Sequence, residues 1–337
     1  MSVQTLPWGN TRSGKSVSRF VLTNAGDVSA EVISYGAILS EMNVPDKQGC
    51  ITNVCLGYPD LEEYEDDPFF IGAVVGRFAN RIAEGRFMLN GKTYTLPINN
   101  PPNHLHGGPA GFYKQVWDAE SFEEPGVSGV VLTYLSEDSE AGYPGNLNVR
   151  TTYRLTDDNT LRIDYEAVTD QPTPVNLTHH GYWNLAGKDS ILGHVLELSA
   201  SRYLEVDDTA IPTGRLLSAE DSPFDFTDPK PIGDDLSNVP GGYDHCFVLD
   251  GTGESLKPAA VLKDPDSGRV MEVLTTKPGL QFYSGNFLEG DFRKHDALCL
   301  EAQFFPDSPN RPDFPSCILN PGETYRHTTV LRFAVES

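Results

Sequence analysis

Two histidines stand side by side in residues 174–187, PVNLTHHGYWNLAG, a stretch whose composition predicts a β-strand. Successive side chains of a strand point to opposite faces, so His179 shares a face with apolar Val175 and Leu177. His180 falls on the opposite, polar face. Because an imidazole exchanges protons near neutral pH, His180 is a candidate general acid or base, with a surface histidine as the alternative. His179 is expected to be a hydrogen-bonded core residue.

A lone carboxylate lies in the otherwise apolar residues 297–305, ALCLEAQFF. Strand alternation places Glu301 on one face with Cys299 and Gln303, opposite a wholly apolar face. Partial burial would raise the pKa of Glu301, which is the property that a general base near neutral pH requires. The alternative is an ordinary strand residue on a solvated face.

Further candidates carry groups that bind hydroxyls or carboxylates. The planar guanidinium of Arg81 carries several N–H donors in a fixed arrangement, which suits sugar hydroxyls or a carboxylate. The alternative is a surface salt bridge. Asp244 precedes the strand predicted at 246–249, and a turn or capping role is the alternative there. Asn80 and Gln281 are the remaining polar candidates.

Motifs that would indicate other chemistry are incomplete. Residues 104–106, His-Leu-His, have the spacing of a two-histidine metal site, but glycines and a proline follow them where a carboxylate is needed. We therefore predict no metal. Residues 251–253, Gly-Thr-Gly, lack the third glycine and the helix of a dinucleotide loop, so they predict a hairpin turn. No cofactor is expected.

Composition limits the class of protein and its partners. The 337-residue chain has a formal net charge of −23, which repels phosphate backbones and anionic membranes, so neither is expected as a partner. The five cysteines are odd in number and lack a CxxC spacing, which argues against a disulfide framework or structural zinc. Without a signal peptide or a long apolar span, the expected location is the cytoplasm.

Alternation of apolar and polar residues with period two dominates the chain. A hairpin with one solvent-exposed face is predicted over residues 147–155 and 161–167. Asn90-Gly91 is a strong signal for a second hairpin. Residues 60–67 predict a short helix, although their charges fit a loop equally well. Because no βαβ rhythm is present, we predict one all-β domain over residues 1–337, a large antiparallel β-sandwich.

An ordered set of short segments resembles the aldose 1-epimerase, or galactose mutarotase, family through most of the chain. The segments are SYGA (34–37), NVCLGY (53–58), NRIAEGRF (80–87), LHGG (105–108), PVNLTHHGYWNLAG (174–187), GGYDH (241–245), QFYSGN (281–286), LEAQ (300–303) and LNPGETY (319–325). The resemblance implies a galactose mutarotase-like supersandwich with an open sugar-binding groove, which agrees with the all-β prediction.

The resemblance also implies roles for individual residues. It implies protonated His180 as general acid, Glu301 as general base, and His106 as a hydrogen-bond donor near the sugar ring oxygen. It implies that the residues in contact with the sugar are Asn80, Arg81, His106, Tyr182, Asp244 and Gln281. The expected partner is a free aldose such as D-galactose or D-glucose, which a monomer or homodimer would interconvert between anomers without metal or cofactor.

Two positions depart from the family, and three other functions stay open. Many relatives have Asn at the position of His179 and Phe at that of Trp183. A glycosidase would use Glu301 with Asp244 as its carboxylate pair. A non-catalytic carbohydrate-binding module would stack sugars on Tyr182 and Trp183. An epimerase of phosphorylated hexoses would need clustered cations, for which the nearby candidates are Arg77, Arg81 and Arg86.

Overall fold

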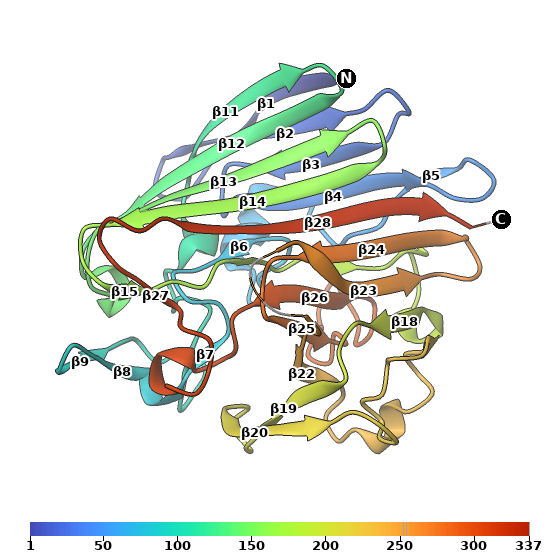
Figure 1. Ribbon diagram of the computed structural model, residues 1–337. Coiled ribbons are helices and arrows are strands. Elements are labelled where there is room, and N and C mark those ends of the chain that lie inside the picture. The colour runs from blue at the N-terminus through green and yellow to red at the C-terminus, as the bar shows by residue number, and fades with distance from the viewer. Residues whose placement is uncertain (252, 254, 337) are drawn as a thin grey trace.

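The computed structural model describes residues 1–251, 253 and 255–336, and β-strands form most of its regular structure (Figure 1). The N-terminal sheet runs in the order β1 (Ser2–Asn10), β2 (Ser16–Thr23), β3 (Ser29–Ile33), β4 (Ile38–Pro45) and β5 (Ile51–Asn53). The long sheet runs in the order β11 (Asp118–Glu124), β12 (Val127–Ser136), β13 (Leu147–Thr156), β14 (Thr160–Thr169), β28 (Tyr325–Val335), β24 (Arg269–Thr275), β23 (Lys257–Lys263), β18 (Val195–Leu198) and β21 (Lys230–Pro231). The site sheet runs in the order β17 (Tyr182–Trp183), β26 (Leu298–Gln303), β25 (Gly279–Tyr283), β22 (Asp244–Val248), β19 (Arg202–Val206) and β20 (Pro212–Ser218).

Short strand pairs connect these sheets. They are β7 (Arg81–Ile82) with β10 (His104–Leu105), β6 (Val74–Val75) with β16 (Thr178–His179), β15 (Thr173–Pro174) with β27 (Ile318–Leu319), and β8 (Arg86–Leu89) with β9 (Lys92–Thr95). The short helix expected at 60–67 is α1 (Leu61–Asp66). Single 3₁₀ turns lie at Ala83–Gly85, Phe112–Lys114, Glu140–Gly142, Ile191–Gly193, Leu236–Asn238 and Ser308–Asn310. None of the described helices has the length and apolar character needed to cross a lipid bilayer.

The long sheet packs its inner face on the N-terminal sheet, and the two form layers of a sandwich (Figure 1). In β13, Leu147 and Tyr153 are fully buried while Arg150 is exposed, as the period-two alternation predicts. The same hydrophobic cluster includes Leu22 and Val32 of the N-terminal sheet. The pairings between the named strands are antiparallel, so the predicted antiparallel β-sandwich is confirmed.

The predicted hairpins have different outcomes. Strands β13 and β14 pair as expected, and so do β8 and β9, which are joined by Asn90 and Gly91 with φ of 51° and 76°. Both values lie in the left-handed region that this two-residue turn requires. The hairpin predicted at residues 251–253 is wrong, because β22 and β23 on either side belong to different sheets. Thr252 itself lies outside the described residues.

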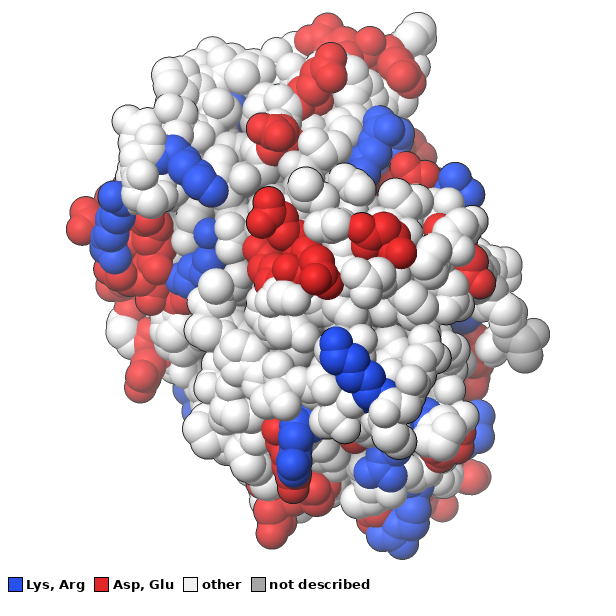
Figure 2. Space-filling model, turned by 90° about the vertical axis from the view of Figure 1, so that its left-hand side faces the viewer, with Lys and Arg blue, Asp and Glu red and all other residues white. Residues whose placement is uncertain are grey.

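The surface carries charges of both signs, in unequal amounts. Figure 2 shows one face, on which Asp and Glu side chains gather in several patches with Lys and Arg side chains between them. This pattern agrees with the net charge of −23. An acidic surface disfavours polyanions but leaves a neutral ligand dependent on the groups of its own site.

The histidine segment is not one strand. Residues 174–187 are divided among β15, β16 and β17, which pair with β27, β6 and β26 respectively. The single strand predicted there is therefore wrong. The opposite orientation of the two histidines is nevertheless correct, because His179 packs against Tyr153 and Trp183 in the core while His180 contacts Glu301.

Candidate active site

The sequence-predicted polar residues meet around a cavity of about 270 Å³ beside the site sheet. Its walls combine polar side chains with aromatic rings, and they are formed by Pro68, Phe69, Phe70, Asn80, Arg81, Asn100, Leu105, His106, His180, Tyr182, Asp244, Tyr283, Phe287 and Glu301. Cavities that hold drug-sized ligands span about 300–1,000 Å³, so this one suits a smaller polar ligand.

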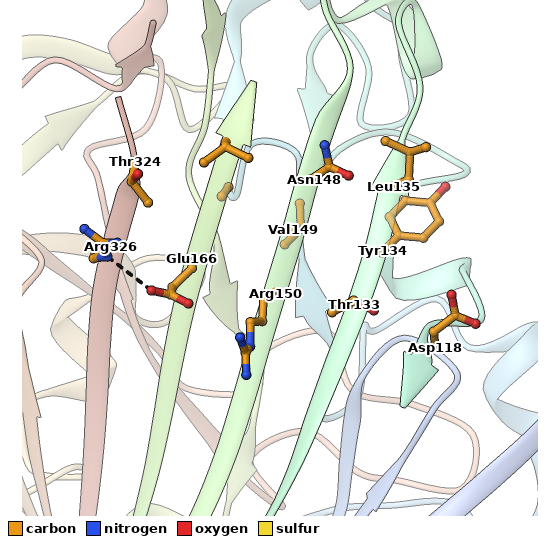
Figure 3. A pocket seen from close by; sticks show the side chains of 12 residues that line it. Asp118, Thr133, Tyr134, Leu135, Asn148, Val149, Arg150, Glu166, Thr324 and Arg326 are labelled. Atoms are coloured by element: carbon orange, nitrogen blue, oxygen red, sulfur yellow. Dashed lines mark hydrogen bonds and ion pairs between the residues drawn. The ribbon is translucent and has the colours of Figure 1, made fainter. Parts of the chain in front are cut away.

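A second, shallower hollow of about 510 Å³ lies on the outer face of the long sheet (Figure 3). Its side chains project from β11, β12, β13, β14 and β28, and Arg326 forms an ion pair with Glu166 across two of these strands. None of the sequence-predicted site residues lines it. The larger hollow is therefore separate from the cluster of candidate acid–base groups.

Strand register brings the polar side chains of the site sheet together. Gln281 of β25 lies opposite Glu301 of β26, and Asp244 of β22 lies opposite Tyr283 of β25. Successive side chains of a strand alternate between faces, so these four residues share the face toward the cavity. The segment containing His180 approaches this face from the adjacent β16–β17 connection.

His180 and Glu301 form a buried pair. The distance from His180 Nε2 to Glu301 Oε1 is 3.7 Å, and both side chains are almost fully buried. Glu301 Oε2 is buried as well and has no hydrogen-bond partner within the described residues. The solvated face considered for Glu301 is therefore wrong, as is the surface position considered for His180. An unpartnered buried carboxyl oxygen costs stability, which is typical of a group kept for chemistry.

Burial shifts the pKa values of the pair in opposite directions. It raises the pKa of Glu301 well above the usual range, the Asp244 carboxylate adds to the rise, and Arg81 opposes it. Burial lowers the pKa of His180 to about 3. Both shifts favour the uncharged forms, a protonated carboxyl and a neutral imidazole. The expected mechanism begins with the charged forms, a carboxylate and an imidazolium.

His106 is fixed as a neutral donor. The backbone N–H of Asn80 donates to His106 Nδ1 at 3.2 Å, so the ring proton is on Nε2. Burial, with the nearby charges of His180 and Arg81, holds the pKa of His106 well below its usual range. Both Asn80 and His106 have left-handed backbones, with φ of 64° and 50°. Such strain in non-glycine residues is common at functional sites.

The two histidines of residues 104–106 do not share a site. Strand β10 ends at Leu105, and His104 contacts the Pro97 carbonyl at 2.7 Å and the Tyr143 hydroxyl at 2.8 Å. A different set, His106, His180 and Glu301, brings its ligand atoms within 4.8 Å of one another. Because the Nδ1 contact of His106 leaves its Nε2 protonated, this set fits proton transfer better than metal ligation.

A chain of hydrogen bonds holds the polar side of the cavity. Gln303 Nε2 donates to Gln281 Oε1 at 3.2 Å, and Gln281 Nε2 donates to Asp244 Oδ1 at 2.7 Å. Arg81 lies 3.6 Å from Asp244 Oδ2 and donates to Asn100 Oδ1 at 3.1 Å. Gln281 faces the same side as Glu301 and is joined to the cavity wall through Asp244. Its direct contact with a sugar stays a prediction.

His179 occupies the core on the opposite side from His180. Its ring packs against Tyr153 and Trp183, with both centroids 6.2 Å away. Its core position is confirmed, and its ring has a hydrogen bond to the Gly72 backbone. Its Nε2 has no hydrogen-bond partner within the described part of the chain, so the expected hydrogen bonding is present at one ring nitrogen. A Cβ at Gly181 would lie 2.6 Å from the His179 ring, which explains the glycine there.

Several cavity residues were missed from the sequence. Asn100, Phe70 and Phe287 lie outside the named strands, where periodicity gives no orientation. The Phe70 ring contacts those of His106 and His180, with centroids at 4.7 and 5.6 Å. Tyr283 had a usable signal, because it shares strand parity with Gln281.

Comparison with known proteins gives a consistent result. The aldose 1-epimerase family model matches residues 18–332. The chain is 44% identical over 347 aligned positions to mouse galactose mutarotase, covering 99% of both chains. It is 39% identical over 338 positions to Escherichia coli (strain K12) aldose 1-epimerase, covering 96% of this chain and 97% of that one. The crystal structure of galactose 1-epimerase from Lactobacillus acidophilus has a TM-score of 0.90, 29% identity and full coverage of both chains.

Proposed function

Because this chain belongs to the aldose 1-epimerase family, we propose that it interconverts the α and β anomers of free aldoses, with Glu301 and His180 as its acid–base pair. The observation that supports this assignment is the buried contact at 3.7 Å between the two side chains, which lies at a cavity of about 270 Å³. The enzyme is an isomerase, and the sugar is its small-molecule partner.

Anomer exchange needs one base and one acid. The C1 hydroxyl loses its proton, the bond between C1 and the ring oxygen breaks, and the ring oxygen gains a proton. Rotation about C1–C2 then presents the other face of the aldehyde, and the reverse steps close the ring. Each positioned acid or base contributes about 10²–10⁴-fold to such a rate.

Catalysis requires the charged forms of the pair, which burial disfavours, so we propose that a proton held by Glu301 moves to His180 Nε2 across the 3.7 Å contact. We propose that sugar hydroxyls entering the cavity favour this transfer, because they solvate the resulting carboxylate and imidazolium. Glu301 then takes the C1 hydroxyl proton, and His180 gives its Nε2 proton to the ring oxygen. Ring opening returns the pair to neutral imidazole and protonated carboxyl.

The remaining cavity residues bind and orient the sugar in this proposal. His106 Nε2–H donates to the ring oxygen or to an adjacent hydroxyl. Asp244 accepts from hydroxyls, and Arg81 and Asn80 donate to them. Tyr182 is fully buried and packs its ring 5.2 Å from that of His180, so it supports the imidazole as well as the apolar part of the sugar.

The rival functions fit the site less well. Trp183 is 1% exposed and packs in the core, so it offers no stacking platform to a sugar. Arg77 donates to the carbonyls of Pro144 and Gly145, and Arg86 pairs with Glu84. Arg81 is thus the one Lys or Arg on the described cavity wall, and it faces Asp244. Among the described residues, the cavity wall therefore lacks the cluster of cations that would bind the phosphate dianion of a phosphorylated hexose.

Polarimetry of freshly dissolved α-D-glucose and α-D-galactose tests the function. The protein should accelerate the approach to the equilibrium rotation after chelator treatment and without nucleotide. Loss of activity with chelator, restored by metal, would contradict the proposed mechanism. Release of reducing sugar from a glycoside would support a glycosidase, and sugar binding without acceleration would support a binding module. Cytoplasmic location, a single domain over residues 1–337, and a monomeric or homodimeric state stay predictions.

Replacing Asp244 with asparagine should raise the KM for aldoses by about tenfold while kcat changes much less, because the lost charge holds substrate and Arg81 but exchanges no proton. Initial rates over a range of sugar concentrations measure both constants. Asp164→Asn is the matched control, since Asp164 also binds arginines but on the outer face of the long sheet. An unchanged KM for both glucose and galactose would remove Asp244 from sugar binding.

A further inference from the structure

Cys299 lies against the candidate acid on the side away from Glu301. It is fully buried in β26, two residues before Glu301, and therefore shares the face toward the cavity. Strand register places it opposite Tyr182 of β17 and Tyr283 of β25. Its Sγ lies 3.6 Å from His180 Nδ1, within the range of hydrogen bonds that involve sulfur. The imidazole is thus held between a thiol at Nδ1 and a carboxyl at Nε2.

The proposed proton transfers are possible with only one tautomer of neutral His180. During ring opening His180 passes from imidazolium to neutral imidazole by losing the Nε2 proton, so Nδ1 must keep its proton in both states. A neutral imidazole with its proton on Nε2 could not accept the proton that Glu301 holds. A group that accepts a hydrogen bond from Nδ1–H would favour the productive tautomer.

We propose, on the basis of the proposed epimerase function, that Cys299 is a positioning residue whose Sγ accepts a hydrogen bond from Nδ1–H of His180 and fixes its catalytic tautomer. The thiol touches no reacting atom. It acts through His180, much as an orienting group acts on a catalytic histidine elsewhere, but without a charge.

A thiol suits this position better than the usual carboxylate. A carboxylate at Nδ1 would stabilise the imidazolium and make it a weaker acid. A neutral sulfur is a weak acceptor, so it orients the ring and leaves the imidazolium able to protonate the ring oxygen. Burial holds the pKa of the Cys299 thiol well above its usual range, which keeps the sulfur neutral at physiological pH.

Two substitutions and a matched control test the proposal. Cys299→Ala should lower kcat about tenfold with KM within about twofold, because the substrate contacts remain. Cys299→Ser should keep more than half of kcat, since a hydroxyl also accepts from Nδ1–H. Cys317→Ala removes a buried thiol that does not contact His180 and should leave kcat unchanged. All three variants are compared by polarimetry and by melting temperature.

The tautomer itself supplies a readout independent of turnover. In ¹⁵N-histidine protein, long-range ¹H–¹⁵N correlations should show His180 protonated at Nδ1 in the wild type and as a mixture in Cys299→Ala, with the signals identified by their loss in His180→Asn. Unchanged kcat and tautomer in Cys299→Ala would overturn the proposal. So would an equal kcat loss in Cys317→Ala, or a Cys299→Ser variant as impaired as Cys299→Ala. If the wild type lacks epimerase activity, the proposed function fails while the tautomer measurement still decides the role of Sγ.

Discussion

Replacing Glu301 with glutamine should lower kcat by at least about 10²–10³-fold, because the amide resembles the carboxyl in shape but neither accepts nor delivers the proton. KM should change little, since no sugar-holding hydrogen bond is removed except at the reacting hydroxyl. Polarimetry with a correction for spontaneous mutarotation measures the residual rate. A variant that keeps more than about a tenth of the wild-type kcat would remove Glu301 from the role of base.

Glu301→Gln should still fold, and the direction in which its stability differs from wild type as pH changes follows from the pKa of Glu301. Burial raises the pKa of Glu301 in the folded protein above its unfolded value, so ionisation opposes folding at higher pH. The free-energy cost of burying Glu301 is absent below its pKa in the unfolded chain and grows as pH rises toward its pKa in the folded protein. Glutamine does not ionise, so the melting temperature of Glu301→Gln relative to wild type should rise between pH 5 and pH 8.

A matched control separates this effect from a general response to carboxyl loss. Glu31 of β3 is another largely buried carboxyl whose pKa is raised by burial, and it contacts Ser40 and Arg19 away from the cavity. Glu31→Gln should therefore keep the wild-type kcat. Inactivation of both variants would indicate that loss of a buried carboxyl, rather than of the base, impairs the enzyme.

The two adjacent histidines should give opposite results when each is replaced with asparagine. His180→Asn should lower kcat by about 10²-fold or more, because asparagine forms a hydrogen bond but has no transferable proton. Its melting temperature should change little at neutral pH and should rise relative to wild type below about pH 6, since burial lowers the pKa of His180 to about 3 and protonation of the imidazole in the unfolded chain then opposes folding. His179→Asn should keep a near-normal kcat and lose about 1–3 kcal/mol of stability, because the smaller side chain packs poorly against Tyr153 and Trp183.

The ratio of the two kcat values decides the assignment. Thermal or urea unfolding measures the stability of both variants relative to wild type. If His179→Asn is the inactive enzyme and His180→Asn the active one, then His180 is not the acid. A smaller stability loss for His179→Asn is also consistent, since His179 Nε2 has no hydrogen-bond partner in the described structure and an asparagine could replace the bond to the Gly72 backbone.

The sequence by itself determined the fold class and the chemical groups of the site. Period-two alternation predicted the β13–β14 hairpin because burial on one face is a local property of each strand. The same parity separated His179 from His180 and placed Glu301 with Cys299, since side-chain direction depends only on neighbouring residues. Resemblance to a family then linked segments that no local pattern connects.

Only the tertiary structure decided how these groups act. The strand predicted over residues 174–187 is divided among different sheets, because the partners of each short strand come from distant parts of the chain. The hydrogen bond from Gln281 to Asp244 joins β25 to β22, and it follows from the register of β22, β25 and β26. The pKa of Glu301 is raised and that of His180 is lowered, because desolvation depends on how many elements close over a side chain. Alternation along a strand predicts which face is buried, but the depth of burial and the choice of partner strand depend on long-range packing.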